Sequence, residues 1–596
     1  MMDPYRMILI NIVSVILLIG LICTYKYIFP KKTPPLLPLL IIISCLPLIS
    51  LLRKGTYESG DLTLHAVFLQ SFFESLKEGI IIPQWAGGLC GGYGCPVYIF
   101  EYVLPYYVGS IFHALGFSYI ASTKLMLASG FIISGIGMYL WVKDHFGKIA
   151  GFVAGLFFLY APYHLMDMHF RVSVGEVLSF APMPYLFLWG KKIVETEKKR
   201  YIVYFAVTFV LLLLSHTSTT AILLPMVFIY TLTIWIRDKK RNIKKVIHFI
   251  TALILGLLLS AYYWIPALLE VQYTWYSKGF EISDFKPFFE YIYSPVLFGF
   301  LFQGHQGELR LIIGYVQIFI VIFSCFLLYK KTIKNNDKPL LLLFLFFFFI
   351  LFLLLQSFSK PVWLHTPLLS TFILPWRLLV PIALITAFIG GIVVKNYKNK
   401  TFIIILCLAT ILSTILNWGN RKTIPEDPNA YNTHWSLYTE YFEPNNTFYE
   451  NQHASRVKLI PDLVLDRAPT NIGVLSGEAE IKELTRTTTR HTYILSAGTD
   501  VVIKENTFYF PGWVVTANKK TIAINYKNTN KIGVIIFTLP KGLYAVTVEF
   551  VDTPIRKVSK IMSSVTGGVL IFYILFQLIF KKRQFNSPKV LSKDLL

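Results

Sequence analysis

The sequence predicts a polytopic α-helical membrane protein that crosses the bilayer about 13 times and carries one β-rich domain outside the cytoplasm. The first reason is composition, because 55% of the 596 residues are hydrophobic and only 15% are charged. Soluble domains carry about 25% charged residues. The second reason is that the apolar residues gather in blocks long enough to cross about 30 Å of hydrocarbon as helices. The third reason is that lysine and arginine are concentrated in alternate loops between these blocks.

The apolar blocks place the predicted spans. We expect spans near residues 7–29, 34–53, 119–142, 149–165, 176–190, 201–215, 218–236, 246–267, 310–329, 339–357, 373–393, 401–418 and 560–580. The clearest block, 340–355, contains no polar side chain. The first block does not resemble a signal peptide, because it is long and weakly basic at its start and leads straight into the second block.

The cations predict the orientation. Loops such as 191–200 and 237–245 are rich in lysine and arginine, whereas loop 166–175 holds only Arg171 and loop 358–372 only Lys360. Because cation-rich loops stay in the cytoplasm, we expect the N-terminus outside and the C-terminus inside a plasma membrane. The net charge of +23 is then a consequence of topology, and nucleic acid is not an expected partner.

This orientation divides the chain into six parts. They are the N-terminal transmembrane helices (1–53), a first large outer loop with amphipathic helices (54–118), a transmembrane core (119–418), an outer β-rich domain (419–559), a last span (560–580) and a basic tail (581–596). A further outer segment is expected at 268–309.

Segment 419–559 differs from the rest because it has no long apolar run. Alternating stretches such as 544–550 lie between turn signals such as Pro511-Gly512. A period of two between turns predicts short antiparallel strands, and several such strands form a β-sandwich.

The six cysteines fall into two groups. Cys23, Cys45, Cys325 and Cys407 lie inside predicted spans as small apolar residues. Cys90 and Cys95 share the first outer loop and could form a disulfide in an oxidising compartment.

Ionisable residues at the outer ends of spans are the candidates for chemistry. We single out two acids, two arginines and three histidines: Asp61, Glu176, Arg171, Arg377, His65, His169 and His216. An arginine at the interface suits a phosphate because its guanidinium offers a fixed fork of donors. A carboxylate beside it can act as a general base, so Asp61 and Glu176 are the catalytic candidates. Trp85 and the nearby tyrosines suit either a sugar platform or an interfacial aromatic belt.

Each of these residues also has a purely structural interpretation. Asp61 could cap the helix that follows it. Arg171 and Glu176 could pair across a short loop, Arg377 could reach lipid head groups, and His216 could be structural. The sequence contains no metal signature such as HExxH or a CxxC pair, so no metal ligands are assigned.

Several short motifs occur in a characteristic order. They are Asp61 with His65, Ile82 to Trp85, Gly91 to Pro96, Ala161 to Tyr163, Arg171-x4-Glu176 and Pro375 to Arg377. This order resembles bacterial and archaeal membrane proteins described as 6-pyruvoyl-tetrahydropterin synthase-related. Tyr509 to Trp513 and Leu539 to Tyr544 are similar to the tail domain of YfhO-type membrane proteins.

Both groups resemble the GT-C class of membrane glycosyltransferases. The resemblance implies polyprenyl-phosphate sugar donors, an acidic residue in the first outer loop that acts as base or metal ligand, and work on the outer face. It makes Asp61 the candidate catalytic residue and puts Arg377 or Arg171 near the donor phosphate. This chain has an extra span before that loop and one Asp where many relatives have two acids, so a divalent metal is left open.

The leading hypothesis is therefore transfer of a sugar from a polyprenyl phosphate to an envelope glycan, lipid or wall polymer. One alternative is a transporter or flippase for lipid-linked glycans, which predicts helices broken near the bilayer centre. Another is a non-catalytic assembly factor for surface polymers. Membrane lipids are partners in all three cases.

Overall fold

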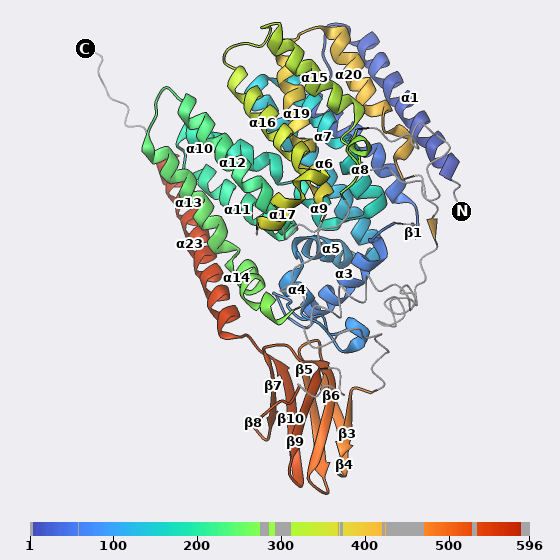
Figure 1. Ribbon diagram of the computed structural model, residues 1–596, viewed down its shortest axis with the longest axis vertical. Helices are drawn as coiled ribbons and strands as arrows, with labels where there is room; N and C mark the ends of the chain where they lie inside the picture. The colour runs from blue at the N-terminus through green and yellow to red at the C-terminus, as the bar shows by residue number, and fades with distance from the viewer. Residues whose placement is uncertain are drawn as a thin grey trace, which may run out of the picture.

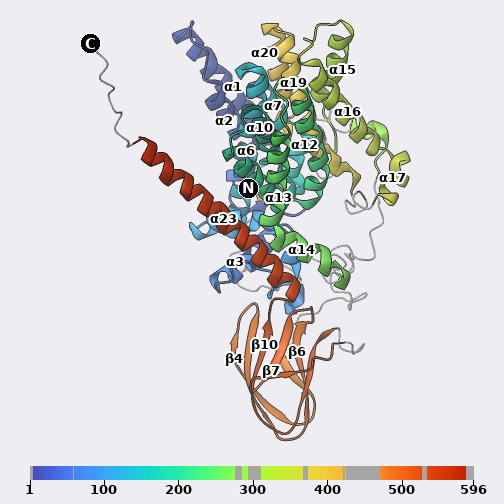
Figure 2. The ribbon, with the colours of Figure 1, turned by 90° about the vertical axis from the view of Figure 1, so that its left-hand side faces the viewer.

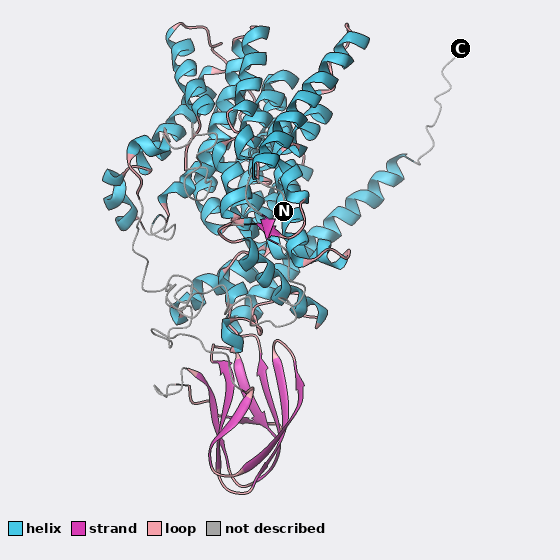
Figure 3. Cartoon of the chain, turned by 90° about the vertical axis from the view of Figure 1, so that its right-hand side faces the viewer, coloured by secondary structure: helices cyan, strands magenta, loops and turns pink. Residues whose placement is uncertain are grey.

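The computed structural model describes residues 4–57, 59–274, 285–292, 311–366, 369, 374–419, 423–424, 470–526 and 533–585. These residues form a large helical body and a smaller β-domain at one end of it (Figures 1 and 3). Glu58, the whole segment 425–469, residues 275–284 and 293–309 of the predicted outer segment 268–309, and the end of the basic tail lie outside the described residues.

The helical body contains every region where a span was predicted. Its helices are α1 (Pro4–Ile28), α2 (Leu36–Cys45), α3 (Leu62–Lys77), α4 (Val97–Phe100), α5 (Leu104–Ala114), α6 (Tyr119–Phe146), α7 (Lys148–Leu159), α8 (Pro162–Met166), α9 (Val174–Phe180), α10 (Met183–Thr196), α11 (Arg200–Ser215), α12 (Thr217–Arg237), α13 (Ile243–Leu259), α14 (Ala261–Glu270), α15 (Tyr315–Tyr329), α16 (Lys338–Leu354), α17 (Lys360–His365), α19 (Leu379–Asn396), α20 (Lys400–Leu412) and α23 (Pro554–Phe585). Short 3-10 or π turns include η1 (Pro47–Leu52), η3 (Asp167–Arg171), η9 (Pro375–Leu378) and η10 (Ile415–Asn417).

Length and hydropathy separate these helices into groups. Among the described residues, 6 helices are long and apolar enough to cross a membrane, and the number rises to 9 if each of three bent pairs counts as one span. Three more apolar helices, α2, α11 and α15, are shorter than 18 residues. The figure of about 13 spans therefore stays a prediction.

Helix α19 forms the centre of the helical body. The most apolar window of the helix that begins at Pro375 is 94% buried. Small residues allow close packing there, since a Cβ added at Gly391 would lie 2.5 Å from Val142. Membrane helices pack in this way where small residues let backbones approach.

The β-domain consists of two antiparallel sheets. Their strands are β3 (Ile472–Ser476), β4 (Ala479–Arg486), β5 (Arg490–Ala497), β6 (Val501–Phe508), β7 (Trp513–Ala517), β8 (Lys520–Ile522), β9 (Val534–Leu539) and β10 (Gly542–Phe550). One sheet has the order β4-β5-β10-β7-β8 and the other β3-β6-β9. Buried residues of both sheets, including Leu495, Ile503 and Val548, belong to one apolar core, so the sheets pack face to face.

The β-domain rests on the loop that contains the disulfide Cys90–Cys95. Trp85 of that loop meets Trp513 edge-to-face at 5.3 Å between ring centroids. The backbone N–H of Phe508 donates to the carbonyl of Tyr93 at 2.9 Å. These contacts join residues more than 400 positions apart in the sequence.

Two further contacts close this end of the molecule. Strand β1 (Thr56–Tyr57) pairs with β2 (Thr423–Ile424), which joins the ends of the predicted second and twelfth spans. Arg556, at the start of α23, is fully buried and pairs with Glu270 of α14 at 2.9 Å. Figure 2 shows α23 leaving the β-domain and running beside α14 and α13. Segments that were predicted to share one side of the membrane therefore lie together.

Candidate functional site

A buried carboxylate, Glu176, organises the candidate site. Glu176 lies in the first turn of α9 and has no exposed surface. Its Oε2 accepts hydrogen bonds from the Tyr163 hydroxyl at 2.8 Å and from Arg171 Nη1 at 3.1 Å. Its Oε1 accepts from Arg171 Nη2 at 3.3 Å and from Arg377 Nε at 3.0 Å. One carboxylate thus fixes two guanidinium groups from separate parts of the chain.

Arg171 is held by a second acid of its own turn. Its Nη1 lies 2.7 Å from Asp167 Oδ1 and 2.7 Å from the Tyr163 hydroxyl. Asp167 is fully buried, whereas the side chains of Arg171 and Arg377 are each 21% exposed. The acids therefore lie inside, whereas the two arginine side chains keep part of their surface exposed. Two arginines in a fixed orientation are suited to bind a phosphate.

The Asp61 loop lies directly against this cluster. The N–H groups of Gly60 and Asp61 donate to the carbonyls of Phe170 and Arg171 at 2.7 and 2.9 Å. A Cβ at Gly60 would lie 2.8 Å from the Arg171 carbonyl oxygen, so only glycine permits this approach. Asp61 occupies the N-cap position of α3, but its side chain makes no capping hydrogen bond. Capping therefore does not account for this carboxylate.

Tyr102 connects Asp61 to the arginines. Burial raises the pKa of Tyr102, and the negative charges of Glu101 and Asp61 raise it further, while the charge of Arg377 lowers it. The Tyr102 ring also packs against the backbone of α9, where a Cβ at Gly175 would lie 2.6 Å from Cε1. Tyr102 therefore lies within electrostatic reach of both Asp61 and Arg377.

Two of the predicted histidines belong to the same region. His65 Nδ1 lies 3.0 Å from the Tyr106 hydroxyl, and Nε2 lies 3.5 Å from the Tyr102 hydroxyl. Burial lowers the pKa of His65 from 6.5 to about 4, although the charge of Glu101 opposes this. The ring of His216 lies 5.8 Å from that of Tyr102, and its Nδ1 lies 2.8 Å from Thr219 Oγ1. Burial likewise lowers the pKa of His216, so both rings are neutral at physiological pH.

The two other predicted residues lie elsewhere. His169 is in the same turn as Arg171, but it is fully buried and faces Gly419, where a Cβ would lie 3.4 Å from Nδ1. Trp85 is 1% exposed and packs between Trp513 and Phe550 beneath the β-domain. The fold thus brings Asp61, His65, Arg171, Glu176, His216 and Arg377 together and leaves His169 and Trp85 outside.

Three residues of the site lie in stretches that the sequence pointed to, but they were not among the predicted site residues. They are Asp167, Tyr163 and Tyr102. Only Asp167 offered a local signal, since an acid four residues before an arginine often pairs with it. Among the described residues, no group of three His, Cys, Asp or Glu side chains could hold a metal ion.

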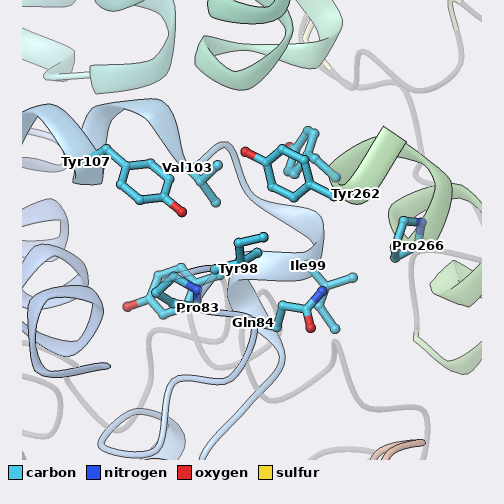
Figure 4. A pocket seen from close by; sticks show the side chains of 10 residues that line it. Pro83, Gln84, Tyr98, Ile99, Val103, Tyr107, Tyr262 and Pro266 are labelled. Carbon is cyan, nitrogen blue, oxygen red and sulfur yellow. The ribbon is translucent and has the colours of Figure 1, made fainter. Parts of the chain in front are cut away.

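The tyrosines of the outer loop do not form an open sugar platform in the described part of the chain. Figure 4 shows a pocket whose lining includes Tyr98, Tyr107, Tyr262 and Gln84. Its volume of about 10 Å³ leaves room for little more than one water molecule. Tyr98 donates to the Phe68 carbonyl at 2.8 Å and Tyr107 to the Ile81 carbonyl at 2.7 Å. These hydroxyls hold the loop together.

Comparison with known proteins shows which family the chain matches. A profile of the family described as "6-pyruvoyl-tetrahydropterin synthase related domain; membrane protein" matches residues 100–420. An uncharacterised protein of Lactococcus lactis subsp. cremoris (strain MG1363) is 27% identical over 301 residues, which are 47% of this chain and 47% of that protein. The match therefore spans about half the length of this curated relative.

Two solved structures show a limited likeness. The arabinofuranosyltransferase AftD from Mycobacteria has a TM-score of 0.43 and 16% identity, over 68% of this chain and 29% of that one. The oligosaccharyltransferase AglB from Archaeoglobus fulgidus, in complex with an inhibitory peptide and a dolichol-phosphate, has a TM-score of 0.39 and 13% identity, over 69% and 59%. A likeness of this size decides nothing about activity.

Proposed function

This chain belongs to the 6-pyruvoyl-tetrahydropterin synthase related family of membrane proteins, and we propose that it is a glycosyltransferase. It moves a sugar from a polyprenyl-phosphate donor to a hydroxyl group of an envelope glycan, lipid or wall polymer. The observation that carries this proposal is the pair Arg171 and Arg377, both bound to the buried Glu176 and both partly exposed. Their position beside the Asp61 loop supplies an anion site and a base in one place.

The roles follow from the positions. Arg171 and Arg377 bind the donor phosphate, because their fixed donors match its oxygens. Glu176 and Asp167 are positioning residues that hold the two guanidinium groups in place. Asp61 is the general base. Tyr102, His65 and His216 shape the space between base and phosphate.

The reaction is a single displacement. Asp61 takes the proton of the acceptor hydroxyl, whose oxygen forms a bond to the anomeric carbon. The bond between that carbon and the phosphate oxygen breaks, and the electron pair leaves with the polyprenyl phosphate. Negative charge grows on this phosphate, where the arginines stabilise it. The sugar inverts at the anomeric carbon.

The proposal also includes the face of the membrane on which the reaction takes place. Cation counting puts the end that holds Asp61, the arginines and the β-domain on the outer face of the plasma membrane. The β-domain, which rests on the 54–118 loop, would then lie above the site and contact the acceptor.

The test is an analysis of membrane glycans in cells that carry Asp61→Asn or Arg377→Ala at normal expression. We expect both variants to lose the product, with the donor lipid accumulating. Glu480→Gln and Arg490→Ala change exposed residues of the β-domain and serve as matched controls. A wild-type glycan profile in both site variants would refute the transferase.

One observation favours a second candidate, a transporter of lipid-linked glycans. Three helix pairs are bent, by 46° between α7 and α8–η3, by 68° between α13 and α14, and by 86° between α16 and α17. Broken helices are common around transported substrates. Fluorescent polyprenyl phosphate in proteoliposomes separates the two functions. A transporter would expose the inner probe to an external quencher, whereas a transferase would leave its sidedness unchanged.

A further inference from the structure

A large groove lies beside the Asp61 loop, outside the candidate site. Its walls come from the end of α2, from η1 and from the start of α6. Its volume is about 1160 Å³, which exceeds the range of about 300–1,000 Å³ for sites that bind small molecules. The groove is therefore large enough for a lipid.

Most of the groove is apolar. Side chains such as Leu48, Leu52, Phe117 and Leu125 line it, and Leu52 is 77% exposed. These residues lie at the end of the predicted second span and at the start of the third. An apolar groove at this level continues the hydrocarbon of the bilayer and suits a lipid chain.

One end of the groove is cationic. Arg53, Lys54 and Lys124 contribute to its lining, and none of the described lining residues carries a carboxyl group. Lys124 is 4% exposed, and its Nζ binds the carbonyls of Arg53 and Gly55. Lys54 is exposed. Three positive charges at the end of an apolar groove complement a lipid phosphate.

A second feature adds positive potential at this end. Helix α6 begins here, and its N-cap residue Ser118, which also lines the groove, accepts a hydrogen bond from the N–H of Ala121 at 3.2 Å. A helix of 28 residues carries a positive partial charge at its N-terminus. The helix end and the three cations therefore act on the same anion.

We propose that this groove binds an anionic phospholipid of the bilayer, with an acyl chain along α2 and α6 and the phosphate beside Arg53, Lys54 and Lys124. The proposal stands whether or not the protein is a transferase. The groove is distinct from the Arg171–Arg377 site because the chain between them is packed. Tyr57, which follows the groove residues 53–55 in the chain, is 4% exposed, and its hydroxyl donates to the Met168 carbonyl at 3.2 Å in the turn that holds Arg171.

A bound phospholipid would also stabilise the Asp61 loop. Lys124 holds residues 53–55, strand β1 follows at 56–57, and Asp61 comes four residues later. The lipid phosphate therefore contacts the segment that leads directly to the proposed base. Removing the lipid would loosen this segment first.

The test uses the full-length protein in nanodiscs with phosphatidylglycerol that carries a photoreactive group in its acyl chain. We expect crosslinks to residues 45–52 and 117–128, and weaker labelling by phosphatidylcholine with the same group. Lys54→Glu should weaken labelling at least about fivefold, because it removes a cation that contributes about 1 kcal/mol near a phosphate and adds a carboxylate that repels the phosphate. Lys360→Glu changes an exposed lysine of α17 and should have no effect.

A second pair of variants tests the apolar part without changing charge. Ala128→Trp fills the groove and should abolish labelling, whereas Ile133→Trp, at a 46% exposed position on the same helix, should not. Equal labelling by both lipids, or unchanged labelling in Lys54→Glu and Ala128→Trp, would overturn the proposal. Displacement by polyprenyl monophosphate but not by unlabelled phosphatidylglycerol would overturn it as well, because the groove would then belong to the donor.

Discussion

Glu176 in the helical body and Glu505 in the β-domain are both fully buried and both bind arginine, but the two clusters are built differently. Glu176 binds Arg171 and Arg377, and Arg377 lies 201 positions away in the sequence. Glu505 of β6 binds Arg486, His491 and Tyr493 at 2.9–3.0 Å, and all three lie within 19 positions. The first cluster joins distant segments of the body, whereas the second joins neighbouring strands across the β-domain.

The balance of charges differs as well. Arg486 is 23% exposed, close to the 21% of Arg171 and Arg377, so exposure alone does not distinguish the clusters. Arg486 faces two carboxylates, since Glu483 lies 3.7 Å away in addition to Glu505. Burial raises the pKa of Glu505, but the hydrogen bond with His491 and the charges of His491 and Arg486 bring it below its usual value. In the β-domain cluster, two carboxylates therefore share one arginine.

The cluster in the helical body has one arginine for each acid and a further acid, Asp61, on the adjacent loop. This difference teaches that a buried ion pair alone does not indicate a site. The more useful sign is the convergence of charged side chains from distant segments, which is found at Glu176.

The largest expected effect compares Glu176→Gln with Glu505→Gln. Each change removes the charge of a fully buried carboxylate that pairs with arginine and should cost about 3–5 kcal/mol in the free energy of unfolding. Only Glu176→Gln should also lower the amount of glycan product per folded molecule, by about 100-fold, since displaced arginines no longer meet the phosphate. Thermal unfolding in detergent and glycan analysis measure the two effects.

Equal loss of product in both variants would remove the functional distinction between the clusters. Glu480→Gln alters an exposed acid of the β-domain and serves as the control for both measurements. Unfolding should be followed in the full chain, because the β-domain packs against the 54–118 loop.

The second effect concerns the pH dependence of stability that comes from His65 of the helical body. His65 lies among tyrosine hydroxyls, and burial lowers its pKa from 6.5 to about 4. Between these two values the unfolded chain binds the proton more readily. The stability from neutral His65 is therefore fully present above pH 6.5 and is lost as the pH falls toward 4, by up to about 3 kcal/mol.

Unfolding of the wild type and of His65→Gln at pH 7 and pH 4.5 measures this contribution. The variant should lose less stability than the wild type between the two values. His365→Gln, at an exposed position of α17, should behave like the wild type. If His65→Gln and the wild type have the same pH dependence, His65 does not become buried in a neutral form.

Much of the architecture could be predicted from the sequence, and the family that the motifs indicated is confirmed. Apolar blocks such as 340–355 predict a helix because nothing else satisfies the backbone in lipid. The period of two in 544–550 likewise predicts β10. The bends between consecutive helices were harder to predict from the sequence. Pro162, at the start of α8, indicates the bend after α7, but the bend at Ser260 depends on how α14 packs against α23.

The candidate site was predictable residue by residue but not as an arrangement. Arg171, Glu176 and Arg377 each stand out as charges at the ends of apolar blocks. That both arginines meet at the Glu176 carboxylate depends on the tertiary packing of α9 and η9. Trp85 was singled out because an outer aromatic ring suits a sugar platform, but its ring lies against Trp513, a contact that only the docked β-domain creates.

The smallest effect exchanges arginine for lysine in each cluster. Arg486→Lys keeps the charge that faces Glu505 but cannot also reach the Tyr493 hydroxyl, which now accepts from Nη1 at 2.8 Å. Loss of one such hydrogen bond should cost about 1 kcal/mol in the free energy of unfolding and leave the glycan product unchanged. Arg377→Lys should lower the free energy of unfolding by a similar amount. It should also lower the product by more than the loss of folded protein accounts for, because an ammonium group cannot replace the guanidinium fork on a phosphate. Unfolding and glycan analysis of the two variants side by side make the comparison, and an unchanged product in Arg377→Lys would reduce Arg377 to the structural role that Arg486 has.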